Sequence, residues 1–375
     1  MDQRHDRRPV ASRAARTRGE NRRERKFQTR RHDSPLREGL PGRLGRRSHA
    51  AHRGSGLPVL TASSCPNACR EQPAWELFAS ERGFRLLRCP ECGLGWTDPP
   101  LGDEEIGAFY PPAWYGENNV RFNPVFEALV RLFRQRRSAV IRRRSKPGPV
   151  LDVGCGRGLI LGELKRRGYR PYGVELSEHA ARHAVHQAGA EVHVGDLQRA
   201  PFPENYFEVV IFWHSLEHFR EPLKALDKAS RLLKPGGLLV VAVPNSESLQ
   251  ARLSGANWFH LDIPRHYFHF GLEPLRRAVQ DRGFRIAQID HFSFEQNPYG
   301  WLQSLYNALG FRFNFLYDFL KNSNARMTPL RKHPVQALGV LLLLPVLLPV
   351  ALILMAYEAA AEEGGTVELY AIKKA

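Results

Sequence analysis

The sequence predicts an α/β fold built on a doubly wound, mostly parallel β-sheet. Three observations support this prediction. Between residues 149 and 243, short apolar runs typical of buried strands alternate with segments of helical apolar spacing. The first apolar run leads directly into a glycine-rich loop, Gly154-Cys-Gly-Arg-Gly158. The acids Glu175 and Asp196 follow the next two runs, and ligands of such sheets bind beyond the carboxyl ends of the strands.

The first strand begins at Pro149 and contains Asp152, two residues before the first glycine. The glycines let the backbone turn sharply and approach a ligand closely, and the helical segment Leu159–Arg167 then directs its N-terminal amides toward that ligand. Dinucleotide-binding folds use the spacing G-x-G-x-x-G, whereas the third glycine here comes one residue earlier. The spacing therefore separates this loop from the dinucleotide type.

The second strand, Arg170–Glu175, ends in a carboxylate that can accept hydrogen bonds from both hydroxyls of a ribose. Ser177 is expected to cap the helix that follows. In chain order the later elements are a helix at Glu178–Ala188, strands at Ala190–Leu197 and Phe207–Trp213, a helix at Pro222–Leu233, a turn at Lys234–Gly237, and strands at Leu238–Val243, Phe284–His291 and Thr366–Lys373. A basic amphipathic helix, from about Pro124 to Arg144, precedes the first strand.

These motifs, in this order, resemble the class I S-adenosylmethionine-dependent methyltransferases over roughly Tyr110 to Lys374. The resemblance implies a seven-stranded, Rossmann-like sheet whose sixth and seventh strands form an antiparallel pair. It also implies S-adenosyl-L-methionine as the methyl donor, with Asp196 near the adenine amino group. The residues it assigns to the donor are Asp152, Gly154, Gly156, Gly158, Glu175, Asp196, Leu197 and Trp213.

The acceptor side is predicted at two histidine-rich segments. Methyl transfer is an in-line displacement, so the protein mainly aligns the reactants, and an oxygen acceptor benefits from a base. His214, Glu217 and His218 follow the fourth strand, and His266 lies in a later loop with His260, Asp262 and Arg265. That loop is either a cap over the substrate or a packed structural turn.

Two further interpretations of the first histidine segment concern a metal. In the quinone O-methyltransferases that the chain resembles, a Glu-His pair helps to hold a divalent metal, which implies this role for Glu217 and His218. The alternative is that the two side chains tie down the loop over the donor. The H-x-x-E-H pattern of inverted zinc peptidases also matches, but that pattern needs both histidines on one helix, and here it follows a strand.

Four of the five cysteines predict a zinc site. Cys65 and Cys69 form one close pair, Cys89 and Cys92 another, and 19 residues separate the pairs. Two such pairs can place four thiolates tetrahedrally around a structural zinc ion. The segment from Trp75 to Arg88 alternates enough to form a hairpin. We expect a zinc-ribbon-like module at 58–100 that depends on the metal to fold; free buried thiols are the alternative.

Residues 1–57 are expected to form a disordered basic tail. Residues 1–54 contain 17 Lys and Arg against 6 Asp and Glu, with almost no aromatic or β-branched residues. The tail could bind anionic lipid or nucleic acid, or be a solvated extension. No signal-peptide pattern follows it, and clustered cysteine pairs with one leftover thiol, Cys155, indicate the reducing cytoplasm.

More than 70 residues separate the sixth and seventh strands. They include an aromatic-rich stretch at 298–320 and an uncharged run from Pro334 to Tyr357, long enough to span a bilayer core of about 30 Å. One crossing would separate the seventh strand from its sheet, and Pro345 and Pro349 are expected to break the helical hydrogen-bond ladder in the middle of the run. We therefore expect a hairpin or shallow monotopic element with 301–319, and with Arg331 and Lys332 at the interface. A buried helical pair or a dimer interface is the alternative.

The expected organisation is a lead-in segment at 101–148, a methyltransferase domain at 149–293 and 364–375, and an apolar insertion at 294–363. In the lead-in segment, Tyr110 and Tyr115 could cover the donor or be packing residues. The resemblance implies O-methylation of a lipid-linked sugar, a glycolipid or a quinone at the cytoplasmic face of the cell membrane. RNA methylation and a non-catalytic membrane adaptor are the alternatives. The tail has no aromatic-rich RNA-binding module, so nucleic acid is not favoured, and no protein partner is evident.

Overall fold

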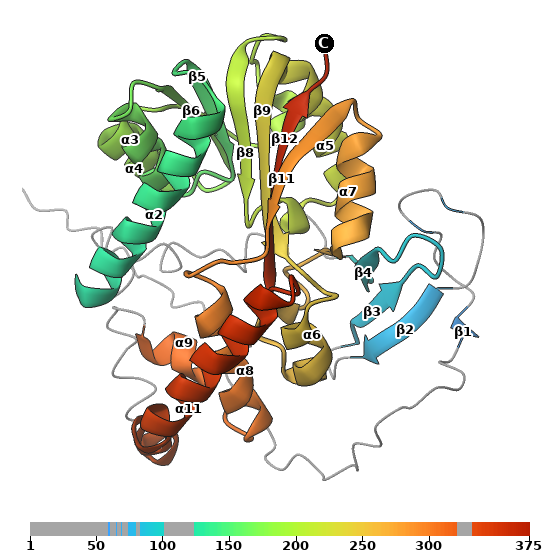
Figure 1. The fold of residues 1–375 in the computed structure, drawn as a ribbon, viewed down its shortest axis with the longest axis vertical. Coiled ribbons are helices and arrows are strands. Elements are labelled where there is room, and N and C mark those ends of the chain that lie inside the picture. The colour runs from blue at the N-terminus through green and yellow to red at the C-terminus, as the bar shows by residue number, and fades with distance from the viewer. Residues whose placement is uncertain are drawn as a thin grey trace, which may run out of the picture. The chain divides into compact units, whose positions relative to one another are not determined.

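The computed structural model describes residues 59–60, 65, 69, 74–79, 83–100, 124–320 and 332–375 (Figure 1). The predicted basic tail at 1–57, the tyrosines Tyr110 and Tyr115, and Arg331 lie outside these residues.

The central feature is a seven-stranded sheet with the order β11-β12-β9-β8-β5-β6-β7. Its strands are β5 (Pro149–Val153), β6 (Arg170–Glu175), β7 (Glu191–Val194), β8 (Phe207–Trp213), β9 (Leu233–Pro244), β11 (Phe284–Asp290) and β12 (Thr366–Lys373). The five strands from β9 to β7 pair in parallel, and β12 pairs antiparallel with both β9 and β11. The doubly wound, mostly parallel sheet and the antiparallel sixth and seventh strands are confirmed.

The strands are almost continuously apolar because helices cover both faces of the sheet. Along β9, Leu239 and Val241 join one hydrophobic cluster, while Leu238 and Val240 join the other. The first cluster includes residues of α5 (Pro222–Leu232) and α7 (Leu272–Gln280), and the second includes residues of α2 (Pro124–Arg144), α3 (Leu159–Lys165) and α4 (Glu178–Ala188). Figure 1 shows the two groups of helices on either side of the sheet.

A few boundaries differ from the predicted ones. The predicted turn at Lys234–Gly237 is assigned within β9, but Phe207 pairs with Leu233 and Val209 with Leu238, so these four residues loop out of the ladder. The third strand is shorter than expected, because a short 3₁₀ helix, Leu197–Arg199, follows β7. Another 3₁₀ helix, Leu216–His218, follows β8.

The cysteine module forms a second sheet with the order β1-β2-β3-β4-β10. Its strands are β1 (Val59–Leu60), β2 (Ala74–Ala79), β3 (Arg85–Arg88), β4 (Gly95–Asp98) and β10 (Phe268–His269). The antiparallel pair β2 and β3 is the predicted hairpin. The strand β10 was not predicted: it belongs to the loop after β9, and its antiparallel pairing with β4 joins the module to the main domain.

That loop also contains α6 (Leu249–Ser254) and 3₁₀ helices at Gly255–Asn257 and Phe259–Leu261.

The insertion between β11 and β12 contains α8 (Asn297–Ala308), α9 (Phe315–Leu320) and α11 (Pro334–Ala360). The helix α11 continues through Pro345 and Pro349, the two residues expected to interrupt its hydrogen-bond ladder. Each proline removes one backbone hydrogen bond, which bends a helix without ending it when packing holds the flanking turns. Here α8 packs along α11 (Figure 1), and Tyr306 donates a hydrogen bond to the Val340 carbonyl over 2.7 Å.

Candidate active site

The glycine-rich loop connects β5 to α3. Gly154, Gly156 and Gly158 have positive φ angles of 79°, 52° and 71°. A Cβ on Gly158 would lie 2.7 Å from the Cβ of Ala184, so glycine is needed for the close approach to α4. A Cβ on Gly156 would meet no atom within 4 Å, and its positive φ disfavours any other residue. The loop therefore presents bare backbone beside open space, as a cradle for a ligand requires.

Glu175, at the end of β6, is tied to this loop. Its carboxylate accepts a hydrogen bond from the Gly156 amide over 2.8 Å and one from the Ser177 amide over 2.9 Å. The Gly195 amide bonds to the Glu175 carbonyl and brings the Asp196 segment alongside. The Asp196 side chain itself caps the following 3₁₀ helix through the Gln198 amide. The three ends of β5, β6 and β7 thus meet at one edge, as predicted.

A cavity of about 140 Å³ lies beside the loop, and we call it the donor cavity because residues predicted to hold the donor line it. Its lining includes three residues predicted for the donor, Asp152, Gly154 and Trp213. The other residues that line it are Arg134, Arg137, Cys155, Arg157, Leu159 and Ile160. The buried Leu197 and the exposed Asp196 do not line this cavity.

The buried carboxyl of Asp152 has a perturbed pKa. Burial raises the pKa of Asp152 from 3.8 to about 7; the Arg137 guanidinium opposes the shift, and the Glu175 carboxylate adds to it. A cationic ligand in the cavity would favour the ionised form. Asp152 is the one acidic residue among the described residues that line this cavity, which also include Arg134, Arg137 and Arg157.

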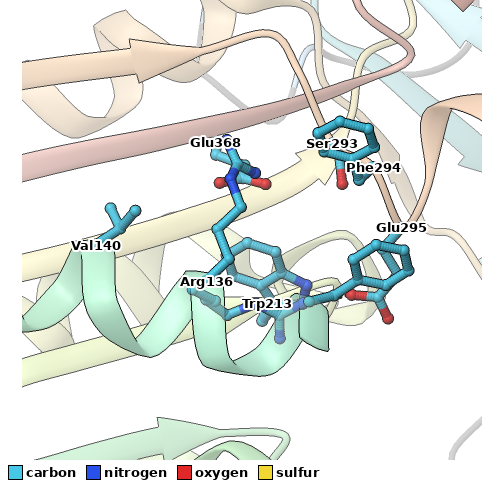
Figure 2. Close-up of a pocket in the computed structure, with 9 residues that line it drawn as sticks. Arg136, Val140, Trp213, Ser293, Phe294, Glu295 and Glu368 are labelled. Atoms are coloured by element: carbon cyan, nitrogen blue, oxygen red, sulfur yellow. Dashed lines mark hydrogen bonds and ion pairs between the residues drawn. The ribbon is translucent and has the colours of Figure 1, made fainter. Parts of the chain in front are cut away.

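Arg137 is a site residue that the sequence analysis missed. Its guanidinium carbon lies 3.2 Å from the centre of the Trp213 ring, and its Nη2 lies 2.7 Å from the Glu295 carboxylate. Figure 2 shows Trp213 and Glu295 around a second, smaller cavity of about 20 Å³, which Arg137 also lines. The basic helix was predicted, but its periodicity could not show which arginine would face the donor cavity.

The two predicted histidine segments form one cluster at the carboxyl end of β8. Glu217 is 1% exposed, and His214 Nδ1 lies 3.4 Å from its carboxylate. The rings of His218 and His266 are 4.7 Å apart between centroids, and those of His214 and His260 stack at 6.2 Å. One ligand atom each from Glu217, His218 and His266 lie within 4.8 Å of one another. The later loop therefore folds over the first histidine segment.

Backbone carbonyls fix the tautomers of two of these histidines. His218 Nδ1 lies 2.9 Å from the Arg265 carbonyl, and His266 Nδ1 lies 2.9 Å from the His260 carbonyl. A carbonyl can only accept, so we assign the proton of each neutral ring to Nδ1 and the lone pair to Nε2. Burial and neighbouring cationic groups hold the pKa of His266 well below its usual range. The His266 ring is therefore neutral at physiological pH.

Arg265 bonds to Asp262 in the same loop, with Nη2 2.7 Å from Oδ1.

Several buried polar atoms in this region have no hydrogen-bond partner among the described residues. They are both carboxylate oxygens of Glu217, Nε2 of His214 and of His260, the indole nitrogen of Trp213 and the hydroxyl of Ser215. Buried polar groups in native proteins are almost always hydrogen-bonded. A Cβ on Gly154 would lie 2.8 Å from the Ser215 Cβ, so the glycine loop adjoins this cluster. The cluster therefore fits a polar ligand or an ion held next to the donor cavity.

The four paired cysteines come together as predicted. Their sulfur atoms lie within 4.8 Å of one another, and those of Cys65 and Cys92 are 3.6 Å apart. Tetrahedral zinc with Zn–S bonds of about 2.3 Å would separate its sulfurs by about 3.8 Å. The Cys92 amide lies 3.5 Å from the Cys89 sulfur, where it would donate to a metal-bound thiolate. The thiols therefore fit a structural zinc ion, while Cys155 lies in the glycine loop.

Comparison with known proteins identifies a family. A family model described as "Methyltransferase domain" matches residues 125–289. The ubiquinone biosynthesis O-methyltransferase of Caulobacter vibrioides is 32% identical over 245 residues, which cover 62% of this chain and 90% of that protein. The corresponding proteins of Maricaulis maris and Alkalilimnicola ehrlichii are 33% and 30% identical, over 36% and 42% of this chain. The chain spans 59% and 66% of their lengths, less than two thirds in each case.

Solved structures show a more distant likeness. The phosphoethanolamine N-methyltransferase 2 of Haemonchus contortus, in complex with S-adenosyl-L-methionine, is 19% identical, with a TM-score of 0.41. The match covers 73% of this chain and 58% of that one.

Proposed function

The chain belongs to the class I S-adenosylmethionine-dependent methyltransferases, and we propose that it methylates a hydroxyl oxygen of a lipophilic acceptor at the cytoplasmic face of the membrane. The observation that carries the proposal is the set of buried polar atoms around Glu217, next to the donor cavity, that have no hydrogen-bond partner in the described part of the chain. Such a cluster costs folding free energy unless a ligand completes it. An acceptor hydroxyl placed there would lie beside the donor.

On the donor side, S-adenosylmethionine would supply a methyl group on a positively charged sulfonium. The Gly154–Gly158 backbone would cradle it, and the Glu175 carboxylate, at the end of β6, would receive the ribose hydroxyls. Asp152 would face the cationic part of the donor in its ionised form. Asp196 and Leu197 would contact the adenine, as the family resemblance implies, from the segment that follows β7.

On the acceptor side, His266 would take the hydroxyl proton, although burial lowers its pKa and so weakens it as a base. Its Nε2 carries the lone pair, because Nδ1 donates to the His260 carbonyl, and Nε2 lies 3.8 Å from the Asp262 carboxylate. His218 presents the same tautomer from the opposite segment. Glu217 and His214 would orient the hydroxyl and balance the charge that the base gains.

The ligand atoms of Glu217, His218 and His266 also fit a divalent cation. Such a cation would lower the pKa of a bound hydroxyl, which is the chemistry that a metal contributes to proton removal. Glu217, His218 and His266 would hold the cation, and the same residues surround the acceptor if His266 acts as the base. The proposed position of the acceptor is therefore the same in both cases.

The acceptor class is proposed from two observations. Relatives from three bacteria are named ubiquinone biosynthesis O-methyltransferases, which supports a phenolic hydroxyl of a quinone precursor ahead of a lipid-linked sugar or glycolipid. Among the described residues, α11 is the one helix long and apolar enough to cross a membrane, and only 17% of its most apolar window is buried. An enzyme docked on the bilayer can reach an acceptor that stays in lipid.

The exposed side chains of α11 support shallow docking. Ten large apolar residues are exposed between Val335, 81% exposed, and Tyr357. The adjoining turn exposes Phe313 and Arg312, and Lys332 is exposed before the helix begins. Apolar residues beside basic ones are typical of elements that lie in the interface of an anionic membrane. The C-terminal end of α11 leads back to β12 inside the sheet, so the helix would enter and leave on one side.

The test is methyl transfer from labelled S-adenosylmethionine to a total lipid extract of bacterial membranes, with mass analysis of the labelled product. We expect an O-methylated lipophilic product. His266→Asn should lower the rate by about 100-fold or more, because Asn can replace the Nδ1 donor but not the Nε2 base. The exposed His186 on α4 gives the matched control, His186→Asn, which should leave the rate unchanged.

Donor affinity, measured by calorimetry, should stay within about twofold in both variants, since neither residue lines the donor cavity. Donor binding without transfer to any lipid would favour the non-catalytic adaptor. Label in an RNA fraction would contradict the proposed acceptor class.

A further inference from the structure

The cysteine module and the acceptor loop share one β-sheet. In the pairing of β4 with β10, Trp96 lies opposite Phe268 and Gly95 lies opposite His269. The side chains of Leu94 and Trp96 are buried in the same hydrophobic cluster as Phe268. The module therefore contributes a strand, β4, to the sheet that contains part of the His266 loop.

Thr97, in the last strand of the module, is the closest link to that histidine. Its amide donates to the Tyr267 carbonyl over 2.8 Å, and its hydroxyl donates to the His266 carbonyl over 2.7 Å. Because the hydroxyl proton is used there, the same oxygen must accept from His269 Nε2, 3.1 Å away. Thr97 is 3% exposed, so solvent water does not reach these groups. Loss of either hydrogen bond would leave a buried polar group without a partner, which costs free energy.

The opposite side of the same loop meets the first histidine segment. The Tyr267 amide donates to the Glu217 carbonyl over 2.9 Å. The residues His266 and Tyr267 are thus held between Thr97 and Glu217, which lie on different parts of the chain. A shift of either support would move the His266 ring relative to His218.

The cysteines determine where Thr97 lies. Two backbone hydrogen bonds close the turn between β3 and β4: the Cys89 amide donates to the Leu94 carbonyl, and the Gly93 amide donates to the Cys89 carbonyl. Cys92 lies within this turn, five residues before Thr97. Four thiolates bound to one metal would fix this turn and hence the position of β4. The donor loop belongs to β5 and α3, which are not part of this sheet.

We propose that Thr97 is a positioning residue for His266, through which the cysteine module sets the geometry of the acceptor site without contacting the donor. The inference rests on the proposed function, because it gives His266 its role there. It assigns the module a part in methyl transfer beyond stabilising the chain. Zinc loss would then lower transfer before it lowers donor binding.

The test compares Thr97→Val, which keeps the shape but loses the hydroxyl, with Thr97→Ser, which restores it. At saturating donor, we expect Thr97→Val to lower kcat toward the membrane lipid extract about tenfold or more, because small misplacements of reacting groups cost this much. Thr97→Ser should recover most of the rate. Zinc content and the Kd for S-adenosylmethionine should match wild type in both variants.

A second measurement does not require an acceptor. The His266 ring resonances, followed by NMR in full-length protein with labelled histidine, should shift in Thr97→Val and return in Thr97→Ser. Unchanged His266 resonances in Thr97→Val would overturn the inference, as would wild-type kcat in that variant. If the wild type transfers no methyl group, the proposed function fails while the resonances still decide the role of Thr97.

Discussion

The guanidinium carbon of Arg137 lies over the indole of Trp213, 3.2 Å from its ring centre, at the wall of the donor cavity. The contact joins the helix before the first strand to the end of β8. It places a fixed positive charge close enough to Asp152 to oppose the effect of burial on the pKa of that carboxyl. The charge state of the donor site therefore depends on a residue outside the glycine motif.

Replacing Arg137 should weaken donor binding. Arg137→Leu removes the charge that favours ionised Asp152, so we expect the Kd for S-adenosylmethionine at pH 7 to rise about tenfold, by calorimetry. Arg136→Leu is the matched control, since Arg136 is the exposed neighbour on the same helix, and it should change the Kd by less than about twofold. Equal effects of the two variants would contradict the assignment.

Donor affinity should rise with pH. The pKa of Asp152 in the donor-free protein is about 7, and the ionised carboxylate attracts a cation. The Kd for S-adenosylmethionine should therefore fall about tenfold from pH 6 to pH 8. The stability of the donor-free protein should change with pH in the opposite direction. The folded-state pKa lies above the ordinary 3.8, so the contribution of Asp152 to stability is complete below about pH 4 and is lost as the pH rises through 7.

The variant Asp152→Asn separates these two effects. It should make the donor Kd weak and independent of pH, while raising the free energy of unfolding of the donor-free protein at pH 8. Calorimetry and denaturant titration at pH 6 and pH 8 measure both. A wild-type Kd that stays constant between these pH values would count against an ionised Asp152 in the complex.

Zinc should bind to the four clustered cysteines in a ratio of about one ion per chain. Cys92→Ser removes a buried ligand, so we expect loss of most of the zinc in metal analysis and a lower melting temperature. Cys155→Ser, the matched control, alters the one cysteine outside the cluster and should keep the zinc. Zinc retained in Cys92→Ser, or no zinc in the wild type, would refute the site.

Membrane docking should depend on the exposed face of α11. The double variant Leu341→Glu, Leu342→Glu places two charges on that face, and we expect at least about tenfold weaker flotation with vesicles containing anionic phospholipid. Val185→Glu with Val194→Glu changes two comparably exposed apolar residues elsewhere and should bind as wild type does. A wild-type protein that forms a stable dimer and ignores vesicles would instead indicate a dimer interface.

Most of the local structure could be predicted from the order of the residues alone. The bounds of β6, β8, β12 and α4 agree with those predicted from apolar spacing and from the Ser177 cap. The glycine motif and the paired cysteines were also visible, because backbone turns and metal knuckles are encoded within a few neighbouring residues. The family resemblance supplied the strand order that local patterns do not contain.

The contacts between distant segments could not be predicted in this way. Thr97 and His266 are 169 positions apart, and nothing in either segment indicates that β10 pairs with β4. The orientation of Arg137 and the continuity of α11 through two prolines likewise depend on what packs against them. Periodicity reports which face of an element is buried, but the partner on that face is fixed by loop closure and side-chain packing across the whole fold.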